Sequence, residues 1–201
     1  SVKKLARSNV LVHEMNCVET LARVNVLCVD KTGTITRPDM SVSDVVFLKD
    51  NVGKLIAGVA GNMDDDNETM KAIKDYYHIT DRDNSAERVY SFSSQNKYSG
   101  AVLDGRCYIF GAPEYVLLDT YAEYEDIFER YSGHGERILV FGECVGDPCG
   151  NIIEEAVNPY AFIILENEIR DTAKETFGYF ASQGVDIVVI SGDNPVTASK
   201  V

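Results

Sequence analysis

The sequence predicts an α/β protein in which a small parallel sheet carries an inserted α+β unit with an antiparallel sheet. Two apolar runs, 24–29 and 186–190, have the composition of strands buried on both faces, as in parallel sheets. Between them, Asp104-Gly105 separates two short β-prone segments and predicts a type I′ hairpin. An antiparallel sheet therefore lies between two strands of a parallel one.

Composition limits the partners of the chain. Its 201 residues are 45% hydrophobic, enough to bury a core, and the formal net charge of −13 excludes nucleic acid and anionic membrane surfaces as partners. Five cysteines without a CxxC pair favour packing or surface thiols in a reducing compartment.

No apolar run approaches the roughly 20 residues that span a bilayer. Both ends lie in helical patterns, so we expect a fragment of a longer polypeptide.

The pattern of apolar residues, turns and caps predicts the remaining elements. The first 23 residues form an amphipathic lead-in, and the break at 37–39 ends the first part of the parallel unit. Asp66 or Asn67 can cap the helix that starts at 68. The expected strands are 24–29, 41–48, 88–93, 100–103, 106–110, 137–141, 161–165 and 186–190, and the expected helices are 55–60, 68–77, 114–133 and 172–183, the last ending on Gly184.

Asp30 follows the first apolar strand directly. The carboxyl ends of strands in open α/β sheets form the crevice in which ligands bind. Gly33 permits a tight loop around a phosphate, and Lys31 adds a positive charge. Asp30 can then attack a phosphoryl group and form an aspartyl phosphate. A capped turn without function is the structural alternative.

The segment Asp30-Lys31-Thr32-Gly33-Thr34 resembles the phosphorylation motif of P-type cation-transporting ATPases, members of the haloacid-dehalogenase-like superfamily. This resemblance implies a partial phosphorylation domain over 1–39 and 159–201, with a nucleotide-binding domain inserted over 40–158. It also implies that Asp30, Lys31, Thr32 and Thr34 are catalytic. Ser191-Gly192-Asp193 resembles the Thr-Gly-Asp element of the family, which holds the transferred phosphoryl group.

Further segments resemble the nucleotide-binding domain of the family. In the segment 92–99, Phe92 corresponds to a phenylalanine that stacks on adenine, and Lys97 to a lysine of the ATP pocket. The segment 110–114 resembles Lys-Gly-Ala-Pro-Glu, with Phe110 in place of the lysine, so Gly111 and Ala112 are further candidates. The resemblance also implies nucleotide contacts by Glu68, Arg137 and Arg170.

Two departures from the family pattern concern the hinge and the metal. Asn167 stands where the family has an aspartate three residues before Arg170, which predicts a weaker hinge contact. The implied Mg²⁺ would be held by Asp30 and the carbonyl of Thr32, but the later acidic loop of the family does not occur in this sequence. We therefore expect inefficient autophosphorylation.

The resemblance implies the ATP-binding and phosphorylation region of a membrane pump. This region would face the cytoplasm of an integral membrane protein whose membrane helices bind the transported cation, and the 111–114 element favours calcium or another hard cation. A soluble phosphohydrolase with a large cap is one alternative. That reaction needs an acid two residues after Asp30, where Thr32 stands. A nucleotide-binding module without turnover is the other.

Overall fold

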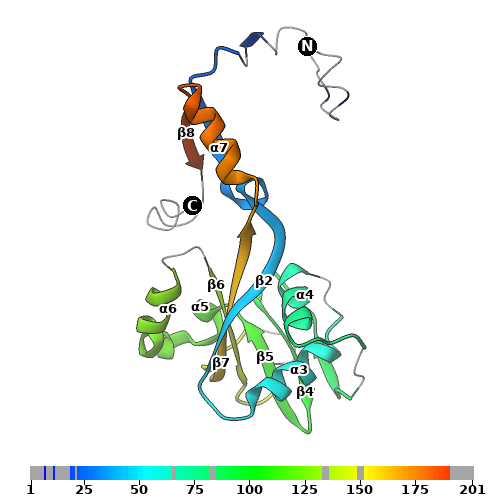
Figure 1. Cartoon of the computed structure of the whole chain (residues 1–201). Helices are drawn as coiled ribbons and strands as arrows, with labels where there is room; N and C mark the ends of the chain where they lie inside the picture. The colour runs from blue at the N-terminus through cyan, green and yellow to red at the C-terminus, as the bar shows by residue number, and fades with distance from the viewer. Residues whose placement is uncertain are drawn as a thin grey trace.

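The computed structural model describes residues 7, 11, 19–20, 22–64, 67–81, 85–132, 136–148 and 152–190, and these form two sheets (Figure 1). In the smaller sheet, β1 (Val26–Asp30) and β8 (Asp186–Ile190) are parallel. In the larger, six antiparallel strands follow the order β2-β7-β6-β5-β4-β3. The predicted combination of a small parallel sheet and an antiparallel sheet flanked by helices is confirmed.

The strands of the larger sheet include two long ones that extend toward the smaller sheet. The tight turn between β4 and β5 has positive φ at both central residues, 50° at Asp104 and 71° at Gly105, as the predicted type I′ hairpin requires. The six strands are β2 (Thr36–Phe47), β3 (Arg88–Tyr90), β4 (Tyr98–Leu103), β5 (Arg106–Gly111), β6 (Arg137–Glu143) and β7 (Asn158–Ile169).

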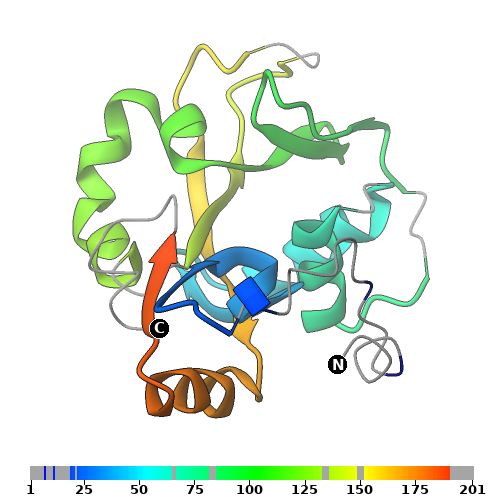
Figure 2. The ribbon, with the colours of Figure 1, turned by 90° about the horizontal axis from the view of Figure 1, so that it is seen from above.

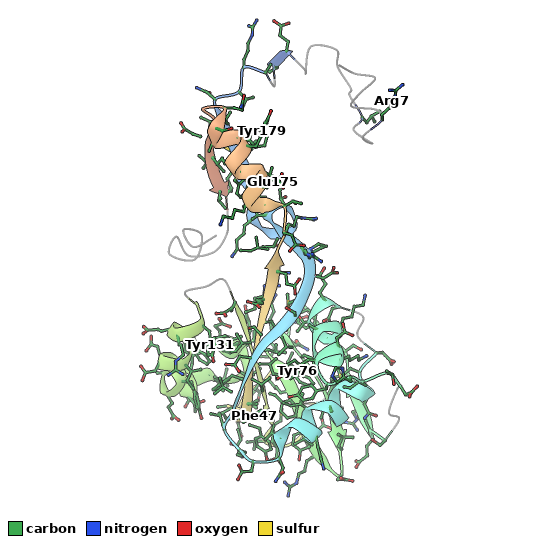
Figure 3. All side chains as sticks on the ribbon, in the orientation of Figure 1. Arg7, Phe47, Tyr76, Tyr131, Glu175 and Tyr179 are labelled. Atoms are coloured by element: carbon green, nitrogen blue, oxygen red, sulfur yellow. The ribbon has the colours of Figure 1, made fainter. Side chains whose placement is uncertain are left out.

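Helices cover both faces of the six-stranded sheet, so two hydrophobic cores form (Figures 1 and 2). On one face lie α3 (Val52–Asn62) and α4 (Glu68–Tyr76), and on the other α5 (Pro113–Val116), the 3₁₀-helix η2 (Leu118–Tyr124) and α6 (Glu125–Ser132). Asn67 caps α4 as predicted, because its side chain accepts a hydrogen bond from the Met70 amide at 2.9 Å. The tyrosine of α6, Tyr131, donates to Asp44 of β2 at 2.5 Å (Figure 3).

Three predicted elements have different bounds. The helix expected over 114–133 is interrupted at Leu118, whose φ of 49° is incompatible with a right-handed helix. The strand expected over 88–93 ends at Tyr90. The strand expected to begin at 41 begins at Thr36, because β2 continues through a bulge at the predicted break. The strands β2 and β7 each cross a proposed domain boundary.

The expectation that β1 and β8 are buried on both faces is wrong. Alternate residues of both strands are exposed, including Val26, Val188 and Ile190. The helix α7 (Ala173–Ser182) lies along these strands (Figure 1), and the two-stranded sheet is half-buried on one face only. Within the described residues, no helix combines the length and the apolar character needed to cross a membrane.

Asn62 joins α3 to the segment before β3 through hydrogen bonds. Its substitution tests how much these bonds stabilise the unit built on the six-stranded sheet. Its amide nitrogen donates to the carbonyl of Gly58 (2.8 Å) and to Ser85 Oγ (3.4 Å). Its oxygen accepts from the Ala86 amide at 2.9 Å, and the residue is buried. We predict that Asn62→Ala lowers the free energy of unfolding by about 2 kcal/mol in urea titrations, because buried polar groups lose their partners. The exposed Asn25→Ala should cost less than about 0.5 kcal/mol, and equal losses would contradict this account.

Candidate functional site

Asp30 is exposed at the carboxyl end of β1. Its Cα partner in the parallel ladder is Ile190, so both strands end at the same edge of the sheet. A carboxylate at that edge can be approached from solvent. The predicted catalytic residues Ser191, Gly192 and Asp193 follow β8 but lie outside the described residues.

The loop after Asp30 is a single π-helical turn, η1 (Lys31–Ile35). Gly33 has φ of 78°, so the predicted need for glycine is met by the backbone conformation. The buried Thr36 closes the turn, because its hydroxyl accepts from the Gly33 amide (3.2 Å) and donates to the Lys31 carbonyl (3.4 Å). Lys31 is buried beneath the loop and Thr34 is exposed, whereas the side chain of Thr32 lies outside the described part.

Arg170 directly follows β7, and its side chain donates hydrogen bonds to this loop. Its Nε donates to the carbonyl of Thr34 at 3.0 Å and its Nη2 to the carbonyl of Gly33 at 3.1 Å. The Arg170 amide donates to the carbonyl of Ile35 at 3.0 Å. The structure therefore places Arg170 at the loop after Asp30 and not among the residues that line the cavity described below.

The side chain of Asn167 contacts the backbone of a bulge in β2, between the two sheets. Residues 37–39 of β2 form an irregularity in the ladder with β7. The Asn167 Nδ2 lies 3.5, 3.3 and 3.1 Å from the carbonyls of Arg37, Pro38 and Asp39. An aspartate has no hydrogen to donate, so these contacts need the asparagine, and the weaker hinge contact stays a prediction.

A cavity of about 610 Å³ lies between the N-terminus of α4 and the six-stranded sheet. Its floor contains the buried Met40, Met70 and Phe110, so a flat apolar group can fit there. Phe92 is 49% exposed and belongs to the lining. The residues that line this cavity are Met40, Asn67, Glu68, Thr69, Met70, Lys71, Phe92, Lys97, Ser99, Phe110, Arg137 and Leu139.

Three cations belong to this lining in a protein of net charge −13: Lys71, Lys97 and Arg137. None of them forms an ion pair with another residue that the structure describes. Glu68 is the acidic lining residue and is exposed. The cavity thus combines an apolar interior with a locally basic, solvent-facing rim, which suits an anionic ligand with an aromatic part.

Four of the predicted nucleotide contacts meet at this cavity: Glu68, Phe92, Lys97 and Arg137. Ala112 lies instead in a second cavity of about 410 Å³, which also contacts Arg137. Gly111 lines neither cavity.

The glycine at 111 has a packing explanation. A Cβ there would lie 2.3 Å from Val116 Cγ1 and 3.2 Å from Tyr98 Cβ. Gly111 therefore lets the short helix α5 approach the sheet, and close approach of a ligand is not needed to explain it.

Sequence reasoning missed Ser99 and Thr36. Ser99 is 5% exposed and lies on β4 opposite Phe110. It stands two residues after Lys97, which precedes β4, and both residues line the cavity. The intervening Tyr98 belongs to the opposite core, and burial raises the pKa of Tyr98 to about 12.

Among the described residues, no three His, Cys, Asp or Glu side chains form a group that could hold a metal ion. Asp30 and the backbone carbonyl of Thr32 are oxygen donors of the kind that Mg²⁺ prefers. They fit part of a magnesium site.

The chain is similar to known cation-transporting ATPases. No family model matches it. Over its whole length it is 38% identical to the calcium-transporting ATPase CtpE of Mycolicibacterium smegmatis and 36% identical to the probable cation-transporting ATPase exp7 of Streptococcus pneumoniae. It covers 25% and 26% of these proteins, so the chain spans about a quarter of the length of the curated relatives it matches.

Two solved structures share the fold. The catalytic domain of the CPx-ATPase CopB-B, from a study of changes upon nucleotide binding, superposes with a TM-score of 0.67 at 12% identity, over 99% of this chain and 66% of that one. A zinc-transporting PIB-type ATPase superposes with a TM-score of 0.67 at 20% identity, over 98% of this chain and 30% of that one. The fold is that of an ATPase catalytic region. By its sequence relatives, the chain belongs to the P-type cation-transporting ATPases.

The closure of the loop by Thr36 can be tested directly. We predict that Thr36→Val makes hydrogen exchange at the Gly33 amide about 10-fold faster, because a side chain of equal shape removes its acceptor. Exchange measured by NMR provides the readout. Thr34→Val, on the exposed side of the same loop, is the matched control, and similar exchange rates in both variants would refute the role of Thr36.

Proposed function

We propose that the chain is the ATP-binding and phosphoacceptor region of a cation-transporting ATPase that forms an aspartyl phosphate. The observation that carries this proposal is the cavity at which Arg137, from β6, meets Phe92 and Lys97, from the segment before β4. A nucleoside triphosphate combines the two features that this cavity suits, a flat apolar ring and several negative charges.

In this proposal, the adenine ring stacks on Phe92 above the apolar floor. Lys97 and Arg137 offset the charge of the triphosphate, and the guanidinium of Arg137 can bind phosphate oxygens with paired donors. Glu68 is the acidic residue of the same rim. The other predicted contacts, Gly111, Ala112 and Arg170, have no place in this binding step.

Asp30 then acts as the nucleophile. A carboxylate oxygen forms a bond to the γ-phosphorus, the bond from that phosphorus to the β–γ bridging oxygen breaks, and ADP leaves with the electron pair. We assign Lys31, Thr32 and Thr34 to the binding of the transferred group, together with Ser191, Gly192 and Asp193. Mg²⁺, when bound by Asp30 and the Thr32 carbonyl, would neutralise charge on the phosphate oxygens.

Transfer requires the cavity and Asp30 to approach each other, because they belong to different sheets (Figure 1). The long strands β2 and β7 join these sheets, so bending at residues 37–39 and 167–170 is the motion that we infer. We retain the domain boundaries 1–39, 40–158 and 159–201 as part of the proposal.

The whole protein would couple this chemistry to transport of a cation across a membrane, with the present region on the cytoplasmic side. The calcium-transporting relative favours a hard cation. A phosphohydrolase is less consistent with Thr32 two residues after Asp30, since threonine is a poor general acid or base. Binding of ATP without turnover is the second candidate, favoured by the incomplete set of magnesium ligands among the described residues.

The adenine site is tested by the aromatic side chain at the cavity. We predict that Phe92→Ala raises the Kd for ATP roughly 10-fold or more, because base stacking on an aromatic ring is lost. Titration calorimetry or NMR on the chain measures this. Phe47→Ala is the matched control, because Phe47 is 52% exposed at the end of β2 and lines no described cavity (Figure 3). An unchanged Kd for ATP in Phe92→Ala would contradict the assignment of Phe92 to the adenine site.

The phosphoacceptor is tested in a polypeptide that contains this chain and has the length of its relatives. With γ-³²P-labelled ATP, Asp30→Asn should abolish acid-stable labelling of the protein, because an amide is a poor nucleophile towards phosphorus. The Kd for ATP should change by less than about twofold, since Asp30 does not line the cavity. Asp39→Asn, an exposed position in the bulge, should retain the label. Labelling that survives Asp30→Asn would exclude Asp30.

A further inference from the structure

Two cysteines face each other across the larger sheet, and neither lines the cavity of about 610 Å³. Cys107 belongs to β5, and Cys144 directly follows β6. These strands pair Tyr108 with Glu143, and one step further the Cys144 amide donates to the Cys107 carbonyl at 2.8 Å. Opposite residues of an antiparallel pair have Cα atoms about 4.5–5.5 Å apart, and a disulfide needs about 4.4–6.8 Å. The two backbones are therefore spaced for a disulfide without a shift in register.

The side chains of this pair also meet. Both residues belong to the same core, are 4% and 9% exposed, and carry free thiols that form a hydrogen bond with each other. This hydrogen bond lowers the pKa of Cys107, because the Cys144 thiol stabilises the Cys107 thiolate. The same bond, followed by burial, raises the pKa of Cys144. Since the thiolate is the form that oxidants attack, the pair combines a more readily ionised sulfur with a second thiol in contact with it.

A separate cavity of about 280 Å³ has Cys144 in its lining. The acidic residues that line it are Asp147, Glu154 and Glu155. An anionic oxidant such as glutathione disulfide is repelled by these carboxylates, whereas hydrogen peroxide is small and uncharged. The cavity therefore favours peroxide as the oxidant that reaches the pair.

We propose that Cys107 and Cys144 are a reversible oxidation site, at which hydrogen peroxide produces a disulfide between β5 and β6. The ionised sulfur attacks one oxygen of the peroxide, the O–O bond breaks, and the released hydroxide takes a proton to become water. The other sulfur loses its proton and attacks the resulting sulfenic acid. An S–S bond forms, the S–O bond breaks, and a second water leaves, so the two thiols are oxidised and the peroxide is reduced.

This site does not depend on the proposed nucleotide chemistry. The disulfide would close a loop over residues 107–144, which contains α5, η2 and α6. Such a covalent link opposes the opening of the core on that face of the sheet. A dithiol such as dithiothreitol restores both thiols by thiol–disulfide exchange, which makes the modification reversible.

The first test asks which sulfurs pair, because the chain also contains Cys17, Cys28 and Cys149. The folded wild-type chain is treated with hydrogen peroxide, its remaining thiols are blocked, and its digest is mapped by mass spectrometry. We expect one dominant disulfide, between Cys107 and Cys144, that dithiothreitol removes. A dominant link between Cys144 and Cys149, or between two molecules, would overturn the proposal.

Single substitutions supply the matched controls. Cys28→Ser removes an exposed thiol of the smaller sheet and should leave the yield of the disulfide unchanged. Cys107→Ala should abolish it. In the oxidised wild-type chain, hydrogen exchange at the Cys144 amide should be about 10-fold slower than in the reduced chain, because the link opposes separation of β5 from β6.

A variant that carries Cys17→Ser, Cys28→Ser and Cys149→Ser retains only the proposed pair. Peroxide should remove both of its thiols and lower its mass by two hydrogen atoms, without addition of oxygen. Thiols that persist in the folded variant, or oxygen added to the sulfurs without a disulfide, would refute the oxidation site. Circular dichroism verifies folding, and the map of the wild-type chain decides the question should a variant not fold.

Discussion

The antiparallel pairing of β2 and β7 is the constraint on which both candidate sites depend. At one end the register pairs Thr36 with Ile169, beside the loop that follows Asp30. Further along, it pairs Met40, which lines the cavity, with Asn167. One ladder therefore begins beside the loop and includes the bulge and part of the cavity wall, so a shift in its register would displace all three together.

The bulge in this ladder explains why polar side chains gather at the connection. Extra residues on one strand leave backbone groups without ladder partners, and the Asn167 amide supplies a donor to those carbonyls. Arg170 does the same for the carbonyls of Gly33 and Thr34. Both residues lie at the C-terminal end of β7, Asn167 within the strand and Arg170 directly after it, so side chains from one short segment satisfy the backbone carbonyls at the connection.

Local chemistry explains what could be predicted from the sequence. The Asp104-Gly105 turn, the Asn67 cap and the positive φ of Gly33 follow from short-range sterics and hydrogen bonding. The break at Leu118, the contacts of Arg170 and the buried position of Ser99 depend on residues distant in sequence, which no local pattern reports. The packing reason for Gly111 could not be predicted either, because it is the Val116 side chain, which approaches Gly111 only when α5 packs on the sheet.

Stability differs between the two sheets, and this bears on the position of Asp30. The larger sheet is covered on both faces, whereas the two strands of the smaller sheet expose alternate apolar residues. Two-stranded pairs with one covered face are marginally stable and open locally at low free-energy cost. The loop after Asp30 is instead ordered by Thr36 of β2 and by Arg170 after β7. The geometry of the loop after Asp30 is therefore set by the strands that lead to the cavity more than by its own sheet.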